Sequence, residues 1–274
     1  MKKIAIQGAQ GSNHHTIAQN FYGQDIWLQE CLSFDALVES LITKKSDQAI
    51  MALENTIAGS IIPNYALIDQ HNLHIVGEQY LNIHHHLMAL PNQRIEDITE
   101  VCSHPMALLQ CKEFFKKHKH IRLIEDVDTA EVAKRIAKQN LKGVAAIAPK
   151  IAADIFGLNI IEDEIQTIKN NATRFVILQT EKPENSLEHI NKASLKFELD
   201  HKRGSLATLL NVISDCKLSL TKIQSLPKIE TLWKYAFFVD VTFNDYMDYK
   251  KAKSIIEIMA TDFKVLGEYK NGRA

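Results

Sequence analysis

Short apolar segments alternate with amphipathic helical patterns over the first 180 residues, and this alternation most restricts the fold. Residues 2–8 and 48–54 are predicted to form buried strands, because brief apolar runs bounded by turn residues are typical of strands covered on both faces. An apolar stripe at helical spacing lies between them: Phe34, Leu37, Val38, Leu41 and Ile42. The alternation predicts a mostly parallel α/β architecture, in which ligands bind beyond the carboxyl ends of the strands.

The same alternation continues further along the chain. Helices are expected near residues 105–118 and 129–141, and the apolar run Val144–Ala148 predicts a buried strand. Pro149 and Gly157 indicate the start and the end of another helix, because proline is favoured in a first helical turn and glycine after a last one. These elements belong to one α/β domain.

A polar segment separates this domain from the rest of the chain. Residues 181–192 include Pro183 and lack apolar periodicity, so they are interpreted as a linker between a first domain, 1–180, and a second, 193–274. The second domain follows the order strand–helix–strand–strand–helix–strand, which predicts a ferredoxin-like (βαββαβ) fold. One face of its first helix is expected in the core: Leu206, Leu209, Leu210 and Ile213.

The charge balance argues against partners that carry phosphates. The 274 residues include 32 lysines and arginines against 33 aspartates and glutamates, a formal net charge of −1, so no basic field attracts a nucleic acid. No apolar stretch approaches the roughly 20 residues of a membrane span, and the apolar start Ile4–Ile6 is too short for a signal peptide. The four cysteines form no CxxC pair. We expect a cytoplasmic protein with reduced thiols and neither nucleic-acid nor membrane partners.

Two polar loops follow predicted strands. Gly8–Ser12 follows the first, where glycines allow close backbone approach and the amides of a helix start attract an anion. It lacks both the ending of a phosphate loop and the third glycine of a dinucleotide fingerprint, so by itself a strand-to-helix turn explains it best. Leu53–Gly59 ends a buried strand, and by themselves Asn55 or Thr56 are best explained as the cap of a following helix.

A third motif, Ser103–Cys111, has a helical pattern. Ser103 is a candidate cap for a helix entered through Pro105. Gln110 lies about two helical turns further on, so it returns toward the helix entrance only if tertiary packing directs it there.

A fourth motif, Asn170–Phe175, opens a predicted strand over residues 173–179. It places the hydroxyl of Thr173 and the guanidinium of Arg174 next to each other at the strand start. An isolated Thr-Arg pair in such a place is usually structural.

The histidines do not form a recognisable metal motif. His84–His86 are consecutive on an expected strand, so neighbouring side chains point to opposite faces and cannot all bind one metal. His14 and His15 have the same limitation in milder form. Since neither an HExxH motif nor a spaced Cys/His set occurs, no metal is expected. A Ser-His-Asp hydrolase is disfavoured because no nucleophile elbow is present.

The motifs are more specific in combination. Four segments follow one another along the chain: Glu54-Asn55-Thr56-x-x-Gly59, Ser103-His104-Pro105-x-Ala107-Leu108-x-Gln110-Cys111, Asp128-Thr129-Ala130 and Asn171-x-Thr173-Arg174-Phe175. Together they resemble the signature segments of the prephenate dehydratase family. The tail, through Gly204-Ser205-Leu206 and Leu220–Pro227, resembles the ACT regulatory domain that follows in monofunctional members.

This resemblance implies both a fold and a reaction. The implied catalytic part is α/β and has two lobes like those of a periplasmic binding protein, with the substrate between them. The implied reaction converts prephenate to phenylpyruvate, water and CO2 in L-phenylalanine biosynthesis. No cofactor is expected, because aromatisation of the ring drives the reaction.

The resemblance also assigns residues by motif position. It implies catalytic roles for Asn55, Ser103, Gln110 and Thr173, and Thr173 matches the family's essential hydroxyl. Because the barrier lies in expelling hydroxide, a donor to the leaving oxygen is the key requirement. Arg174 is expected to hold the side-chain carboxylate of the substrate. Further substrate contacts are expected from Phe175, Glu54, Thr56, Gly11 and Ser12.

Two segments depart from the family pattern. The opening loop reads Gly8–His14 where the family usually has Gly-Pro-x-Gly-Thr-aromatic-Ser. In the tail, the usual Glu-Ser-Arg-Pro is replaced by Gln224–Pro227, which removes a carboxylate and a guanidinium. If L-phenylalanine binds the tail, its expected contacts are Gly204, Ser205, Leu206, Gln224, Ser225 and Leu226.

Two alternative functions stay open at this point. Arogenate dehydratase acts on a substrate that has an amino group in place of the keto oxygen, and a non-catalytic small-molecule-binding regulator could share the same architecture. A homodimer or homotetramer is expected in each case, because a βαββαβ unit has an exposed sheet face or edge that pairs with a copy of itself.

Overall fold

The computed structural model describes four stretches of the chain: 1–183, 189–200, 202–227 and 235–273. They fold into two compact units, and each unit combines segments that are distant in sequence. Residues 1–60 and 80–175 form the first unit, and residues 61–79 join the chain from 176 onward in the second. Within the described stretches, no helix has both the length and the apolarity needed to span a membrane.

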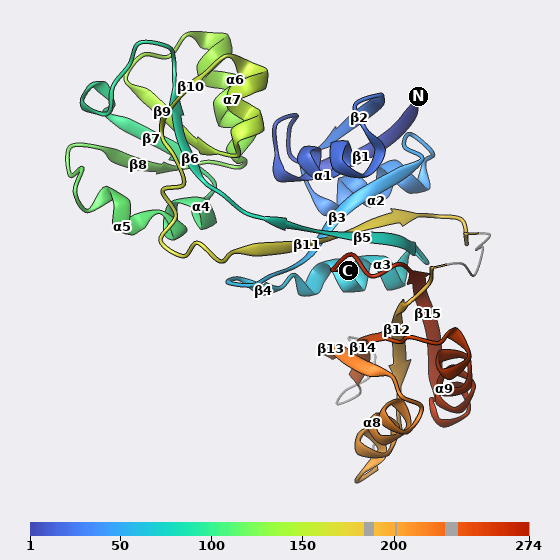
Figure 1. Ribbon diagram of the computed structural model, residues 1–274. Coiled ribbons are helices and arrows are strands. Elements are labelled where there is room, and N and C mark those ends of the chain that lie inside the picture. The colour runs from blue at the N-terminus through green and yellow to red at the C-terminus, as the bar shows by residue number, and fades with distance from the viewer. Residues whose placement is uncertain (184–188, 201, 228–234, 274) are drawn as a thin grey trace. The chain divides into compact units, whose positions relative to one another are not determined.

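The N-terminal sheet has the strand order β2-β1-β3-β11-β5, with β4 paired to β3 (Figure 1). Its strands are β1 (Lys2–Gln7), β2 (Ile26–Cys31), β3 (Gln48–Asn55), β4 (Gly59–Ser60), β5 (His74–Asn82) and β11 (Ala172–Gln179). Helices α1 (Asn13–Tyr22) and α2 (Phe34–Ile42) connect β1, β2 and β3. Strand β1 runs parallel to β2 and β3, which confirms the predicted parallel α/β pattern.

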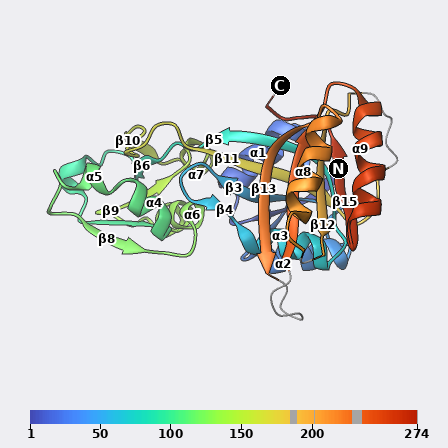
Figure 2. The same cartoon turned by 90° about the horizontal axis from the view of Figure 1, so that it is seen from below.

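A second sheet has the order β10-β6-β9-β7-β8. Its strands are β6 (His86–Ala89), β7 (Glu100–Ser103), β8 (Arg122–Glu125), β9 (Val144–Ala148) and β10 (Asn159–Glu162). Its helices, seen in Figure 2, are α4 (Pro105–Gln110), α5 (Lys112–Phe115), α6 (Thr129–Gln139) and α7 (Lys150–Phe156). The segment η1 (Ile95–Asp97) is a short 3-10 turn. Strand β9 has the predicted bounds, and α7 ends as predicted at Gly157 in the left-handed conformation.

Helices cover both faces of this second sheet. Successive side chains of its strands point to opposite faces, and each face packs in its own hydrophobic cluster. Leu87 packs in a cluster with Leu108 of α4 and Phe115 of α5. The next residue, Met88, packs with Val132 of α6 and Ala152 of α7 on the other face. Strand β6 therefore has apolar side chains buried on both of its faces, as a sheet covered by helices on both sides requires.

The helix expected over 105–118 is instead two short helices, α4 and α5. The chain turns at Cys111, and this turn places both Cys111 and Phe115 in the same buried cluster. Helical periodicity is present on both sides of the break, so sequence alone did not reveal it.

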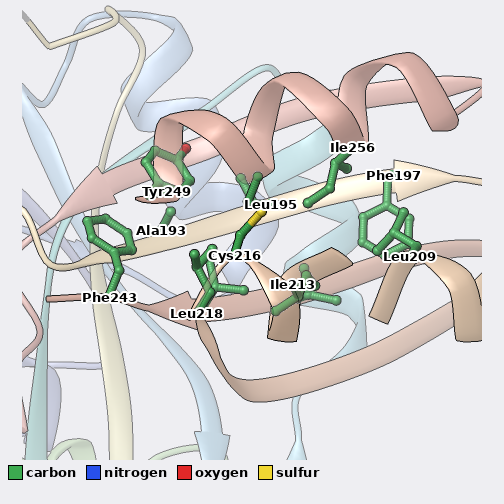
Figure 3. Close-up of a cluster of buried hydrophobic side chains, with 13 residues drawn as sticks. Ala193, Leu195, Phe197, Leu209, Ile213, Cys216, Leu218, Phe243, Tyr249 and Ile256 are labelled. Carbon is green, nitrogen blue, oxygen red and sulfur yellow. The ribbon is translucent and has the colours of Figure 1, made fainter. Parts of the chain in front are cut away.

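The C-terminal sheet has the antiparallel order β13-β14-β12-β15. Its elements are β12 (Lys192–Glu198), α8 (Ser205–Asp215), β13 (Ser219–Pro227), β14 (Tyr235–Thr242), α9 (Tyr246–Met259) and β15 (Asp262–Tyr269), in the predicted βαββαβ order. Leu209 and Ile213 of α8 and Ile256 of α9 pack on one face of the sheet, with Leu195 (Figure 3). Lys192 belongs to β12 and not to the predicted linker, of which residues 184–188 lie outside the described residues.

The opposite face of this sheet packs against a segment from the first third of the sequence. Tyr65 of α3 (Ile62–Gln70) makes an edge contact with Phe238, with ring centroids 5.5 Å apart. A Cβ atom on Gly267 would lie 2.2 Å from the carbonyl oxygen of Ile75. A glycine is therefore needed for this close approach. The boundary predicted at 180 misses this packing, since apolar periodicity does not tell where a helix packs.

A buried ion pair also links β5 to β12. Lys192 Nζ lies 2.8 and 2.9 Å from the two carboxylate oxygens of Glu78, and the N–H of Gly272 donates to Glu78 at 3.0 Å. The Glu78 side chain is fully buried and that of Lys192 is 3% exposed. Neither charge is exposed to water, so the ion pair offsets part of the free-energy cost of burying each charge.

We expect Lys192→Met to lower the free energy of unfolding by about 3–5 kcal/mol, because the change removes the ammonium group that pairs with the buried Glu78 carboxylate. Urea titration followed by circular dichroism measures this loss. The double variant Glu78→Leu/Lys192→Met is expected to recover much of it. The matched control is Lys116→Met, which removes an exposed ion pair with Glu113 and is expected to cost at most about 1 kcal/mol. A loss for Lys192→Met no larger than the control's would show that the buried pair does not matter.

Candidate functional site

The end of β3 lies beside the start of β11, and Thr56 joins the two segments. The N–H of Thr56 donates to the carbonyl of Ala172 at 2.9 Å, and the N–H of Ala172 donates to Thr56 Oγ1 at 3.0 Å. Thr56 was predicted as a substrate contact or a helix cap. Here its hydroxyl oxygen accepts a hydrogen bond from the backbone of β11. This junction places Asn55 next to Thr173.

Asn55 has a fixed orientation. Its Oδ1 accepts from the backbone N–H groups of Ile57 and Ala58, both at 2.9 Å. Because backbone N–H groups can only donate, the Nδ2 amide must face the other way. It donates to Thr173 Oγ1 at 2.9 Å and to Asn171 Oδ1 at 2.6 Å. The predicted helix cap is wrong, since Asn55 closes the turn between the antiparallel strands β3 and β4.

Thr173 is buried, with 7% of its surface exposed. Among the residues that the structure describes, Asn55 is the hydrogen-bond partner of Thr173 Oγ1, and Asn55 is the donor in that bond. The hydroxyl proton of Thr173 is therefore left available for another acceptor.

Gln110 joins the same network through Asn171. Asn171 Nδ2 donates to Gln110 Oε1 at 3.0 Å, and His85 Nε2 lies 2.8 Å from the same oxygen. Gln110 ends α4, so tertiary packing does direct it toward Asn55 and Thr173. The Nε2 group of Gln110 has no protein acceptor within the described part of the chain, although it can donate two hydrogen bonds.

Ser103 is not part of this network. Its side chain is completely buried, and its hydroxyl donates to the carbonyl of Ile147 in the neighbouring strand β9 at 2.7 Å. The predicted cap is also wrong, because His104 Nδ1 accepts from the N–H of Met106 at the start of α4. As the last residue of β7, Ser103 points into the sheet, where it stabilises the strand pair.

Arg174 lies behind Thr173, inside the protein. The residue is 1% exposed, and its Nη1 lies 3.3 Å from Glu54 Oε1. The next side chain, Phe175, is buried against His14, with ring centroids 4.9 Å apart. These contacts favour structural roles for Arg174, Glu54 and Phe175 over the substrate contacts that the sequence suggested.

The opening loop is held by the protein itself. Four amides of the loop donate to protein acceptors: Gly8 to Cys31, Gln10 to Glu30, Gly11 to His15 and Ser12 to Ala9. A Cβ atom on Gly8 would lie 2.5 Å from Asp128 Oδ2, so the loop packs tightly. Ser12 caps α1 through the N–H of His15. The amides of Gly11 and Ser12 already have protein acceptors, and a contact of either residue with a ligand stays a prediction.

Sequence reasoning missed His85 and the amide side chain of Asn171. His84–His86 were expected on a strand, but only His86 lies in one, because β5 ends at Asn82. The three imidazoles have separate partners, which are Glu164 for His84, Gln110 for His85 and Asp163 for His86. The signal available in the sequence was the run of three histidines, His84–His86, between two apolar segments.

Burial favours the neutral form of His14 and His85. It lowers the pKa of His85 below its ordinary value, with the nearby imidazoles of His84 and His86 adding to the effect. Burial also lowers the pKa of His14 to about 3. Within the described part of the chain, the donors of this network that remain available are the Thr173 hydroxyl and the Gln110 amide, and both are uncharged. Such a site can donate hydrogen bonds to an oxygen-rich ligand without placing a cation against it.

Known proteins resemble this chain over most of its length. The sequence matches the family model "Prephenate dehydratase" over residues 4–183. It is 36% identical over 279 residues to arogenate dehydratase/prephenate dehydratase 2 of Arabidopsis thaliana, which covers 97% of this chain and 72% of the relative.

Two solved structures share the fold. Prephenate dehydratase from Arthrobacter aurescens in complex with L-Phe superposes with a TM-score of 0.85 at 21% identity, covering 99% of this chain and 90% of that one. A quorum-quenching acylase, GqqA, superposes with a TM-score of 0.87 at 22% identity, covering 98% of both chains. The fold by itself therefore does not decide the reaction. The family match over most of the chain does decide membership: this chain belongs to the prephenate dehydratase family.

Proposed function

We propose that the chain is a lyase of phenylalanine biosynthesis that converts prephenate to phenylpyruvate, CO2 and water. Family membership supports this proposal. The observation that carries it is the hydrogen bond from Asn55 Nδ2 to Thr173 Oγ1, which directs the hydroxyl proton of Thr173 away from Asn55.

The reaction makes an aromatic ring from a cyclohexadiene. The electron pair of the bond to the ring carboxylate enters the ring, CO2 leaves, and the bond to the opposite hydroxyl breaks. The departing oxygen carries the electron pair as hydroxide and takes up one proton to become water. A hydrogen bond from Thr173 to this oxygen stabilises the charge that develops in the transition state. Since the threonine hydroxyl is a very weak acid, its role is that of an oriented donor or a relay.

Neutral donors suit the other end of the substrate. A cation paired with the departing carboxylate would stabilise the ground state and slow the loss of CO2. Gln110 Nε2 is an uncharged donor in the same network as Thr173. We assign it to orient an oxygen of the substrate.

Arogenate is the second candidate substrate, because the Arabidopsis relative is named for both activities. The decisive experiment gives purified protein prephenate or arogenate in separate reactions, without a cofactor, and measures phenylpyruvate and phenylalanine. We expect phenylpyruvate from prephenate. A large excess of phenylalanine formed from arogenate would reassign the substrate. No product from either would contradict the lyase proposal and favour a non-catalytic binding protein.

Thr173→Val is expected to fold but to lose at least about a hundredfold in kcat, because valine keeps the shape of the side chain and removes the donor. Steady-state kinetics with the preferred substrate measures this loss. Thr173→Ser is the matched control, since it retains a hydroxyl, and it is expected to keep much more activity. Equal kinetics for the valine variant and the wild type would remove Thr173 from the mechanism.

Asn55→Asp makes a sharper test of orientation. The carboxylate keeps an oxygen for the N–H groups of Ile57 and Ala58, but its second oxygen faces Thr173 and accepts the hydroxyl proton. We therefore expect kcat to fall about a hundredfold with little loss of folding. The control is Asn20→Asp on the exposed side of α1, which should leave the kinetics unchanged. If Asn55→Asp keeps full activity, the direction of the Asn55–Thr173 bond is not needed.

We further propose that the C-terminal βαββαβ unit is an ACT-type regulatory domain. The neighbour from Arthrobacter aurescens was solved with L-Phe. In this chain, Gly204 precedes α8 with a φ of +87°, and Gln224 and Leu226 lie on β13. These positions are the candidate contacts for an amino acid.

Restoring the family's charges is expected to strengthen binding of L-phenylalanine. The variant Gln224→Glu/Leu226→Arg supplies a carboxylate for the ammonium group and a guanidinium for the carboxylate. We expect its affinity to exceed that of the wild type by at least about tenfold, because even one of the two added charge-assisted hydrogen bonds allows that much. Isothermal titration calorimetry measures both proteins. An unchanged or weaker affinity would show that L-phenylalanine does not contact β13 in this way.

A further inference from the structure

We propose that His85 is a positioning residue for the reaction: its Nε2–H holds Gln110 Oε1, so that the Gln110 NH2 group stays available to the substrate. This inference rests on the proposed function, because the kinetic tests of His85 need the proposed lyase activity. The observation that carries it is the 2.8 Å contact between His85 Nε2 and Gln110 Oε1, at the end of the network that begins at Asn55.

The direction of each hydrogen bond in this network follows from the backbone. The N–H groups of Ile57 and Ala58 fix Oδ1 of Asn55 as an acceptor, so Asn55 Nδ2 donates to Asn171 Oδ1. Asn171 must then donate through Nδ2, and the atom it meets on Gln110 is the oxygen. Gln110 Oε1 can only accept, which requires a proton on Nε2 of His85. The geometry thus selects the Nε2–H tautomer.

The surroundings of His85 hold the ring in place. The residue is 6% exposed, and among the described residues its Nδ1 has no hydrogen-bond partner. Its backbone is fixed on both sides, because its N–H donates to Gln166 Oε1 at 2.9 Å and its carbonyl accepts from Ile165 at 2.8 Å. A ring with a bare, buried Nδ1 tolerates the neutral tautomer and disfavours protonation.

The second donor to Gln110 Oε1 makes the arrangement rigid. Asn171 alone would leave the carboxamide of Gln110 free to pivot about one hydrogen bond, whereas two donors fix both the position and the plane of the group. A donor held in place before the substrate binds is worth more in the transition state than one that must reorganise. His85 therefore acts through Gln110.

Two substitutions at His85 separate this role from simple packing. His85→Phe keeps a planar ring and removes the donor, and we expect kcat/KM to fall about tenfold. His85→Gln can place an amide N–H near the position of Nε2, and we expect it to retain most of the activity. The matched control is His86→Phe, which removes a neighbouring buried imidazole whose partner is Asp163, and it should leave the kinetics close to wild type. A glutamine variant as impaired as the phenylalanine variant would overturn the proposal.

A double-mutant cycle with Gln110 tests whether His85 acts through it. In a Gln110→Ala background, His85→Phe is expected to cause no further loss, because the group that it positions is gone. Additive losses would show that His85 contributes by another route and would overturn the proposal. Circular dichroism and thermal melting confirm that the compared variants are folded.

The tautomer of His85 can be measured without any substrate. Nitrogen-15 NMR of the imidazole in the full chain distinguishes a protonated Nε2 from a protonated Nδ1, and the His85→Gln spectrum assigns the signal. We expect the neutral Nε2–H form, and an Nδ1–H form would overturn the inference. If the wild type forms no product from prephenate or arogenate, the proposed function fails, while this spectrum still decides the contact with Gln110. It also decides the question if His85→Phe does not fold.

Discussion

The hydrogen bonds from the backbone of Ile57 and Ala58 to Asn55 are the constraint on which the site depends. A carboxamide can normally turn over and exchange its donor and acceptor ends. Here two main-chain donors prevent this exchange. The fixed orientation of Asn55 in turn sets which end of Asn171 donates and which end of Gln110 accepts. The tight turn between β3 and β4 thereby decides on which side the hydroxyl of Thr173 presents its proton.

The network also shows why the segments must come from several parts of the chain. Asn55 ends β3, Thr173 lies at the start of β11, and Gln110 ends α4 of the other sheet. Each of them sits at the end of a regular element whose core packing fixes the backbone. The full charges nearby, Glu54 and Arg174, are paired with each other. Among the described residues, the donors of the network that remain available, on Thr173 and Gln110, are neutral. This matches a reaction in which a carboxylate has to depart.

Periodicity located strands such as β1, β3 and β9 and helices such as α2 and α6, because burial on one or both faces leaves a direct pattern in the sequence. It could not predict where a side chain at the end of an element points. Ser103 and Gln110 belong to one motif, yet Ser103 bonds to Ile147 inside the sheet, whereas Gln110 reaches Asn171. His85 was considered only as a metal ligand, because its partner is 25 residues away and comes into contact through the fold. Long-range contacts of this kind are absent from local patterns.

The placement of α3 has a consequence for how the polypeptide can be divided. The segment 61–79 packs on the C-terminal sheet through Tyr65, Ile75 and Glu78, although the flanking segments belong to the first unit. The main chain therefore passes between the units three times. A protein truncated after residue 180 would expose the apolar side of α3 and leave the Glu78 carboxylate without Lys192. An isolated catalytic fragment should thus aggregate more readily than the intact chain, and a cut at the polar linker would not yield two independent proteins.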